Sequence, residues 1–258
     1  MGEPSTIDIG ILSAASWGCT PLVRRKLDDG ANIESTGPDG DTPLLLAIKD
    51  SVYVHELYKT PTNNELVEFL LKRGADVSAM NRYGRSAIHI CASGGSVTQL
   101  MLLLEHKADV NQKTRIGQKN SPLHISSIND HVEFAKCLIH HGADIDSLDI
   151  THRTPIMAAV AASYTPLMNL EIVKYLIEEG ANLMLRGLDG QTTKSLSIGM
   201  NREELTKVIQ AAIQIKETCM AFAFGSIQRL GEGSVVNQID PLAMKMILHE
   251  VLYEKEKQ

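Results

Sequence analysis

Four segments of the chain alternate hydrophobic and polar residues with the period of an α-helix. In each of them apolar residues recur at positions i, i+3 and i+4, as Leu66, Phe69 and Leu70 do, so that one stripe of the helix is apolar. A folded protein buries such a stripe against a neighbouring element. The pattern predicts amphipathic helices over residues 65–72, 98–105, 132–140 and 170–178.

A shorter apolar block stands before each of these helices. Each block begins with Thr or Ser, and in three of the four copies Pro follows, a pair that favours an N-cap with Pro at the first helical position. Small residues come next and allow neighbouring helices to approach closely. These blocks predict a second set of helices, beginning after Thr42, Ser86, Ser121 and Thr154.

The turn after each amphipathic helix carries a repeated signature of Gly, Ala, then Asp or Asn. Its copies begin at Gly30, Gly74, Lys107, Gly142 and Gly180. Gly suits a left-handed helix C-cap, and Asp or Asn suits the turn that follows. Successive copies lie 44, 33, 35 and 38 residues apart, which is a base period of 33 with insertions of 11, 0, 2 and 5 residues.

These residues resemble the ankyrin repeat family, whose pattern is D-x-x-G-x-T-P-L-H-x-A-A, a second helix and then G-A-D-x-N. The resemblance covers about residues 8–211. It implies an all-α ankyrin-repeat solenoid, in which helix pairs stack into a curved array with hairpin-like tips on one side. The first helix of each pair is then expected to line the concave face.

The resemblance divides the chain into a repeat array and an extension. We expect an array of about six repeats over residues 1–213, with a degenerate cap at each end, because the first and last copies lack parts of the pattern. Insertions at residues 51–61 and 163–167 both fall between the two helices of their repeats. Residues 214–258 are expected to form a helical extension on or beyond the last repeat.

The extension begins with a long apolar segment, residues 205–224, that predicts a single helix. Gly225, Gly231 and Gly233 predict a loop, and Asp240 followed by Pro241 predicts the start of a final helix. One interpretation is an extended cap over the last repeat. The other is a degenerate docking box, loosely similar to the SOCS-box or F-box-like tails that attach some ankyrin proteins to ubiquitin ligases.

Composition narrows the class of protein. The chain is 43% apolar, only 4% aromatic and has a formal net charge of −6, which fits a core of Leu, Ile, Val and Ala and opposes a surface built for nucleic acid. It has no run of about 18 apolar residues of the kind that spans a membrane. We expect a cytoplasmic protein, present also in the nucleus, that binds neither membrane nor nucleic acid.

Three consecutive central tips are basic in this acidic chain. Their variable positions predict a surface for an acidic or phosphorylated peptide, steered by charge and held by Arg–carboxylate pairs. The alternative is a solvated rim that balances acidic helices elsewhere. The partner-binding candidates on these tips are Arg82, Tyr83, Arg85, Arg115, Ile116, His152 and Arg153.

The insertion at residues 51–61 brings aromatic residues into a chain that has few of them. Tyr is a favoured interface anchor, so Tyr53, His55 and Tyr58 are further partner-binding candidates at the edge of the array. The alternative is a longer first helix whose apolar residues pack on the stack.

No pattern indicates catalysis, a metal site or a cofactor. The spacing of Cys137, His140 and His141 resembles a ligand set, yet Cys137 falls on the apolar stripe of its helix and the histidines fall at the helix C-terminus, where His is favoured. His89 and His124 occupy the His of T-P-L-H, which in the family serves the hydrogen bonds of the turn. The chain also lacks G-x-S-x-G, Walker A and H-E-x-x-H motifs.

One modification is suggested by the resemblance. Asn111, with Leu103 eight residues before it and Asp109-Val110 directly ahead, resembles the ankyrin context that asparaginyl hydroxylases accept. The alternative is an Asn that only bonds its own turn.

The function expected from the sequence is that of a monomeric, non-catalytic protein-interaction module or scaffold. It binds a partner protein or acidic peptide through its concave face and hairpin tips. The alternative is a substrate-recruiting adaptor of a ubiquitin ligase, acting through the degenerate C-terminal box. A third interpretation, the ankyrin part of an enzyme whose catalytic site lies on another chain, has less support.

Overall fold

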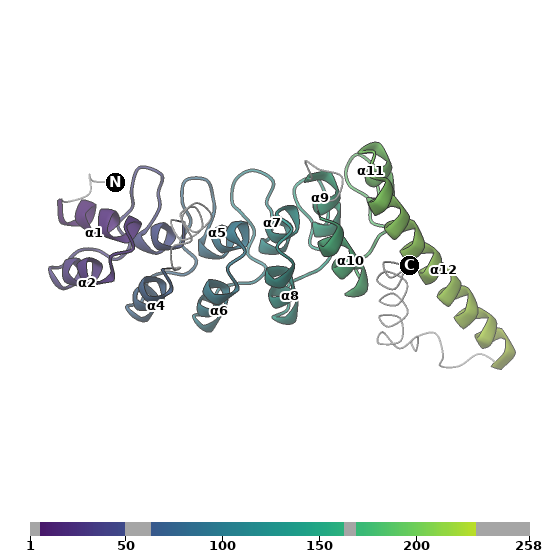
Figure 1. Cartoon of the computed structure of the whole chain (residues 1–258), viewed down its shortest axis with the longest axis horizontal. Helices are drawn as coiled ribbons and strands as arrows, with labels where there is room; N and C mark the ends of the chain where they lie inside the picture. Colours follow the sequence, from purple (N-terminus) through teal and green to yellow (C-terminus); the bar gives the residue numbers. More distant parts are fainter. Residues whose placement is uncertain (1–5, 50–62, 163–168, 231–258) are drawn as a thin grey trace. The chain divides into compact units, whose positions relative to one another are not determined.

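A computed structural model describes residues 6–49, 63–162 and 169–230 of the chain (Figure 1). All regular structure in the described residues is helical, and residues 43–49 are helical as well as the labelled elements. The labelled helices are α1 (Thr6–Ser16), α2 (Thr20–Asp28), α4 (Asn64–Lys72), α5 (Ala87–Gly94), α6 (Val97–Glu105), α7 (Pro122–Ile128), α8 (Val132–His140), α9 (Pro155–Ala162), α10 (Leu170–Glu178), α11 (Thr193–Gly199) and α12 (Glu203–Leu230).

The chain divides into two compact units, which we call the first unit (Met1–Asp144) and the second unit (Ile145–Gln258). Two kinds of helix alternate along the chain in the first unit. We call the first helix of each pair the inner helix (α1, residues 43–49, α5 and α7) and the second the outer helix (α2, α4, α6 and α8). Successive outer helices contact one another, and α5 also contacts α7 (Figure 1). The second unit contains the pairs α9 with α10 and α11 with α12.

The amphipathic stripes form the core of both units. Leu66 and Leu70 of α4, Leu103 of α6 and Leu138 of α8 are almost fully buried, as the periodicity predicts. The helices α8 and α10 have the predicted bounds, and α4 and α6 each begin one residue earlier than predicted. The all-α ankyrin-type architecture is therefore confirmed.

The prediction for the end of the long helix was wrong. A loop was expected to begin at Gly225, yet α12 extends through that residue to Leu230. A single Gly inside a helix costs only about 1 kcal/mol relative to Ala, so helix-forming neighbours can outweigh it. The other predicted loop glycines and the final helix lie outside the described residues, as do both insertions.

Two histidines of the inner helices in the first unit, His89 and His124, cap those helices. The Ser86 N–H donates to Nδ1 of His89 at 3.2 Å, and Ser121 makes the same bond to His124 at 3.3 Å. The opposite ring nitrogen of His89 lies 2.9 Å from the backbone oxygen of Gln112. The turn-bonding role expected for these two histidines is confirmed.

Candidate partner-binding surface

Five hairpin tips connect the repeats, and each places a short turn before an inner helix. The first unit contains tip 1 (residues 37–42), tip 2 (81–86) and tip 3 (114–121), and the second unit contains tip 4 (149–154) and tip 5 (187–192). A backbone hydrogen bond closes every tip, with Asn81 N–H donating to the Arg85 oxygen at 3.0 Å in tip 2. The tips therefore share one pattern of backbone hydrogen bonding and differ mainly in their side chains.

Neighbouring tips within a unit are joined by backbone hydrogen bonds. In the first unit the Arg82 N–H donates to the Asp39 oxygen at 2.8 Å, and the Arg115 N–H donates to the Gly84 oxygen at 2.9 Å. In the second unit the Leu188 N–H donates to the Thr151 oxygen at 2.9 Å. These bonds hold the variable side chains of adjacent tips in register.

The Arg82 side chain is engaged within the first unit. Its guanidinium lies 2.6 Å from a carboxylate oxygen of Asp39 and 4.8 Å from the centre of the Tyr83 ring. The hydrogen bond to the Tyr83 hydroxyl is the main reason that the pKa of Arg82 lies above its usual range. Arg82 and Tyr83 thus form one paired unit, in which Tyr83 stays 47% exposed.

Two other predicted basic residues also have partners in the chain. Arg85 reaches along α5 and donates to the Ser93 hydroxyl at 2.8 Å. In the second unit Arg153 lies 3.3 Å from a carboxylate oxygen of Asp189. The pKa of Asp189 is lowered by the hydrogen bond from the Gln191 N–H and, to a smaller extent, by Arg153.

Tip 3 concentrates the cations that lack such partners. Within the described part of the chain, the side chains of Arg115 and Lys119 make no hydrogen bond or ion pair, and both are exposed. Ile116 lies between them in the sequence and is 57% exposed. Arg115 is also bonded through its backbone to tip 2, which brings tip 3 beside Tyr83.

His152 occupies the left-handed position of tip 4, with φ of 57°. The corresponding residues of the other tips are glycines, at 40, 84, 117 and 190, all with positive φ. The Asp149 carboxylate accepts the N–H groups of Thr151 at 2.7 Å and Arg153 at 2.9 Å, and so fixes this turn. An exposed imidazole is therefore presented from a backbone conformation that a non-glycine residue rarely adopts.

Sequence reasoning missed three exposed apolar residues. Ile150 of tip 4 and Leu188 of tip 5 are 50% and 67% exposed, at the tip position that Arg82 and Arg115 occupy in the first unit. Trp17, the only Trp of the chain, directly follows α1 and is 76% exposed. Aligning the tips would have identified the first two, but Trp17 belongs to no repeated position.

The edge candidates Tyr53, His55 and Tyr58 lie outside the described residues, so they stay predictions. Asn111 is described, and its side chain joins two repeats of the first unit. Its Nδ2 donates to the Gly142 oxygen at 3.1 Å, and its Oδ1 accepts the Asp144 N–H at 2.8 Å. Hydroxylation of Asn111 stays a prediction, at a residue whose amide already has a structural role.

The Cys137 region does not assemble a metal site. Its Sγ lies 3.6 Å from Met101 Sδ and 3.8 Å from His141 Nδ1, and this imidazole nitrogen is also 2.8 Å from the Cys137 oxygen. Burial raises the pKa of the Cys137 thiol, which disfavours the thiolate. The described residues contain no cluster of three His, Cys, Asp or Glu side chains suited to a metal ion.

Comparison with known proteins identifies the family. The model described as "Ankyrin repeats (3 copies)" matches residues 11–114, 57–149 and 103–187. These matches together cover most of the chain, which therefore belongs to the ankyrin repeat family. Among the helices described here, none is long and apolar enough to cross a membrane.

Relatives and solved structures agree with this assignment. The chain is 30% identical over 167 residues to chicken nuclear factor NF-kappa-B p105 subunit, covering 61% of this chain and 17% of that protein. It is 27% identical over 179 residues to human ankyrin repeat and SOCS box protein 6, covering 61% and 41%. The crystal structure of the ankyrin repeat protein EF0377 matches with a TM-score of 0.66 and 26% identity, covering 79% of this chain and 97% of that one.

The chain spans less than half the length of these curated relatives. Ankyrin repeats are typically a protein-interaction module, and the repeats are the part that the chain shares with its relatives.

Proposed function

We propose that this chain is a non-catalytic interaction module whose tip 3, with Tyr83 of tip 2, binds an acidic or phosphorylated segment of a partner protein. The observation that carries the proposal is the pair of exposed cations Arg115 and Lys119, which have no partner in the described chain, on either side of the exposed Ile116. A carboxylate or phosphate can therefore bind them without displacing an internal ion pair.

Charge supports this choice among the basic tips. Arg82, Arg85 and Arg153 already bond Asp39, Ser93 and Asp189, so an incoming anion would compete with these groups. Arg115 has the planar guanidinium that can hold a carboxylate or phosphate by two parallel hydrogen bonds. In a chain of net charge −6, such a local cluster also steers an acidic partner toward one surface.

Quantitative affinity purification from a eukaryotic cell tests the proposal. The double variant Arg115→Glu/Lys119→Glu should lose the wild-type partners, with recovery lowered about tenfold, because repulsion replaces attraction at the contact. Arg25→Glu is a matched control, since Arg25 lies on outer helix α2 with 79% of its side chain exposed. Recovery of all partners by the double variant would contradict the proposal.

Four further predictions accompany this function. His152 and Arg153 offer a separate contact in the second unit, and Tyr53, His55 and Tyr58 offer an edge contact. The module is proposed to act as a monomer, which light scattering after gel filtration would check. An addition of 16 Da at Asn111 in the intact mass of protein from eukaryotic cells would support its modification.

A second candidate function is recruitment of substrates to a ubiquitin ligase. It is favoured by the similarity to ankyrin repeat and SOCS box protein 6, which covers 61% of this chain. Residues 231–258, which follow α12, would supply the docking box. Their deletion should abolish ligase association and leave thermal stability unchanged, whereas a cap would show a large fall in melting temperature with partner binding intact.

A further inference from the structure

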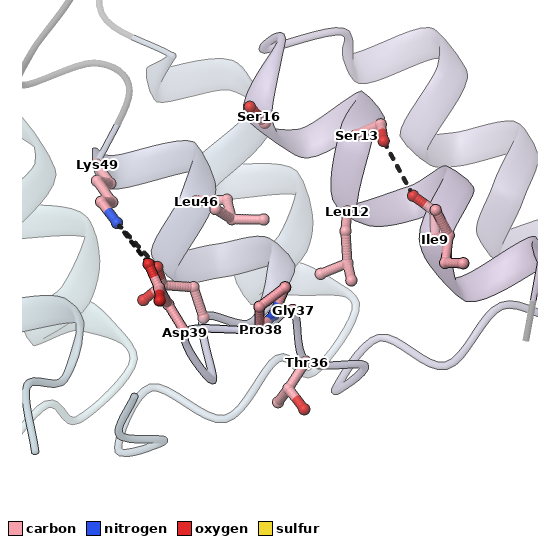
Figure 2. Close-up of a pocket in the computed structure, with 11 residues that line it drawn as sticks. Ile9, Leu12, Ser13, Ser16, Thr36, Gly37, Pro38, Asp39, Leu46 and Lys49 are labelled. Carbon is pink, nitrogen blue, oxygen red and sulfur yellow. Dashed lines mark hydrogen bonds and ion pairs between the residues drawn. The ribbon is translucent and has the colours of Figure 1, made fainter. Parts of the chain in front are cut away.

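A hollow lies on the inner side of the first unit, beside tip 1. Figure 2 shows its walls: α1, the helical residues 43–49 and the turn of tip 1. Its volume is about 700 Å³, within the range of sites that hold ligands in proteins. The wall is mainly apolar, with side chains from Ile9, Leu12, Pro38 and Leu46.

Tip 1 differs from tip 2 at the residue before the inner-helix cap, which is Asp41 in tip 1 and Arg85 in tip 2. Arg85 immediately precedes the inner-helix cap of its repeat and extends along α5 as far as Ser93. The equivalent residue of tip 1 is Asp41, which is 2% exposed and accepts a hydrogen bond from Asn81 at 2.8 Å. Asp41 therefore stays at the base of its tip, where its side chain lines the hollow together with Leu46.

The charged groups around the hollow neutralise one another. Lys49 Nζ lies 3.0 Å from a carboxylate oxygen of Asp41, and Asp39 is paired with Arg82 at 2.6 Å. The Ser13 hydroxyl donates to the Ile9 oxygen at 3.1 Å within α1. An uncharged apolar group can thus enter without leaving any of these polar groups unpaired.

We propose that this hollow receives an aliphatic or aromatic side chain of the same acidic segment that binds tip 3. The inference rests on the proposed function and adds a second, apolar contact to it. Packed helices lie about 8–10 Å apart, so the hollow and tip 3 are about 20–25 Å apart within the first unit. An extended peptide covers about 3.3–3.6 Å per residue, so about six to eight residues separate the apolar anchor from the acidic cluster.

Synthetic peptides provide a direct test. Each peptide carries one Leu and a run of glutamates, separated by a Gly/Ser spacer of about seven or about two residues. Each peptide is made in two orders, with the Leu before or after the glutamates in the sequence. Each order is also made with Ser in place of Leu. Binding is followed by chemical shifts of the ¹⁵N-labelled protein, and Trp17 fluorescence gives a second signal, because Trp17 directly follows Ser16 of the wall.

In one of the two sequence orders, the Leu peptide with the long spacer should bind about tenfold more tightly than its Ser version. This is the gain expected for burial of one Leu side chain. Filling the hollow by Ser13→Phe should abolish this difference, and Ser13→Ala, which removes the hydroxyl without filling the space, should preserve it. Ser16→Phe is the second filling variant, used if Ser13→Phe does not fold as judged by circular dichroism.

The outcomes separate the two proposals. An equal affinity of the Leu and Ser peptides, or a Leu advantage that survives Ser13→Phe and Ser16→Phe, overturns the apolar anchor. When the apolar anchor is overturned in this way, the proposed function still stands if Arg115→Glu weakens the binding of both long-spacer peptides, the Leu version and the Ser version. If Arg115→Glu weakens the binding of neither peptide, or if no peptide shifts any resonance of tip 3, the proposed function itself is contradicted.

Discussion

The tips of the first unit and those of the second unit share one backbone and carry different surfaces. In the first unit the second tip position holds Pro38 in tip 1 and then Arg82 and Arg115 in tips 2 and 3, whereas in the second unit it holds Ile150 and Leu188. Both units join adjacent tips by the same kind of backbone bond. The comparison teaches that the repeat fixes the main chain and leaves the chemistry of the exposed positions free, so one fold can present charge in one region and apolar surface in another.

The units also differ in how they cap their inner helices. In the first unit His89 and His124 close the capping boxes of α5 and α7, whereas in the second unit Ser195 takes that place in α11. Of the caps named here, only the imidazoles carry a side chain that can gain a proton in acid. Acid should therefore distinguish the two units.

The largest expected effect is acid destabilisation of the first unit through His89. Burial lowers the pKa of His89 from 6.5 to about 4. The native state then binds fewer protons than the unfolded state, so stability is fully present above pH 6.5 and is lost as the pH falls from 6.5 to about 4. The loss should reach about 3 kcal/mol in urea unfolding followed by circular dichroism.

The variant His89→Gln is the control for this effect. It should be less stable at neutral pH, because the capping bonds change, yet it should lose less stability on acidification. The α11 region, which is capped by Ser195, should show no comparable change in amide exchange across the same pH range. A pH dependence that His89→Gln leaves unaltered would assign the acid sensitivity to another group.

Gly84→Ala should produce the next largest effect. A Cβ at Gly84 would lie 2.6 Å from the Ile116 nitrogen and 2.8 Å from the Arg115 nitrogen, and φ is +69°. Backbone strain of about 1–2 kcal/mol and displacement of tip 3 should together cost about 2–4 kcal/mol of unfolding free energy. The substitution also tests whether tip 2 and tip 3 act as one surface, because it should weaken partner binding.

Gly190→Ala in the second unit is the matched comparison. Its φ is +75°, but a Cβ there would meet no heavy atom within 4 Å. Only the cost of backbone strain then remains, about 1–2 kcal/mol of unfolding free energy. Equal losses for the two variants in denaturant titrations would show that close packing of the tips has no part in the stability of the first unit.

Asn111→Ala should have an intermediate effect on the first unit. The amide makes two hydrogen bonds to the following repeat, through Gly142 and Asp144, so its loss should cost about 1–2 kcal/mol. In the second unit Asp146 makes the equivalent bond to the Asn182 N–H at 2.9 Å. Asp146→Ala removes the matching contact of the second unit and should cost a similar amount, about 1–2 kcal/mol, and an unchanged melting temperature of Asp146→Ala would contradict the comparison.

Local sequence signals predicted the helices well, because the apolar stripes and the Ser or Thr caps act within a few residues. The bounds of α8 and α10 follow from their apolar stripes alone, since neither helix begins at a Ser or Thr cap. The pairing of Arg82 with Asp39 and of Arg153 with Asp189 was not predictable in this way, since it depends on which residues the stacking of repeats brings together. The hollow beside tip 1 escaped prediction for the same reason: it depends on how α1, the helical residues 43–49 and tip 1 pack together.

The smallest expected effect concerns His152, the residue that breaks the glycine pattern of the tips. Its φ of 57° costs a non-glycine residue about 1–2 kcal/mol, and Gly would regain part of this while adding entropy to the unfolded chain. His152→Gly should therefore stabilise the second unit by about 0.5–1 kcal/mol in urea unfolding. His152→Asn, which tolerates the left-handed region and retains a polar side chain, should be nearly neutral.

A gain in stability would leave the strained imidazole without a structural reason, and strained residues of this kind are found at binding sites. The same His152→Gly variant should then lose part of the binding that depends on the second unit, as affinity purification would show. If His152→Gly instead lowers the unfolding free energy, the imidazole makes a stabilising contact within tip 4. The left-handed histidine would then belong to the fold of the second unit and not to its partner-binding surface.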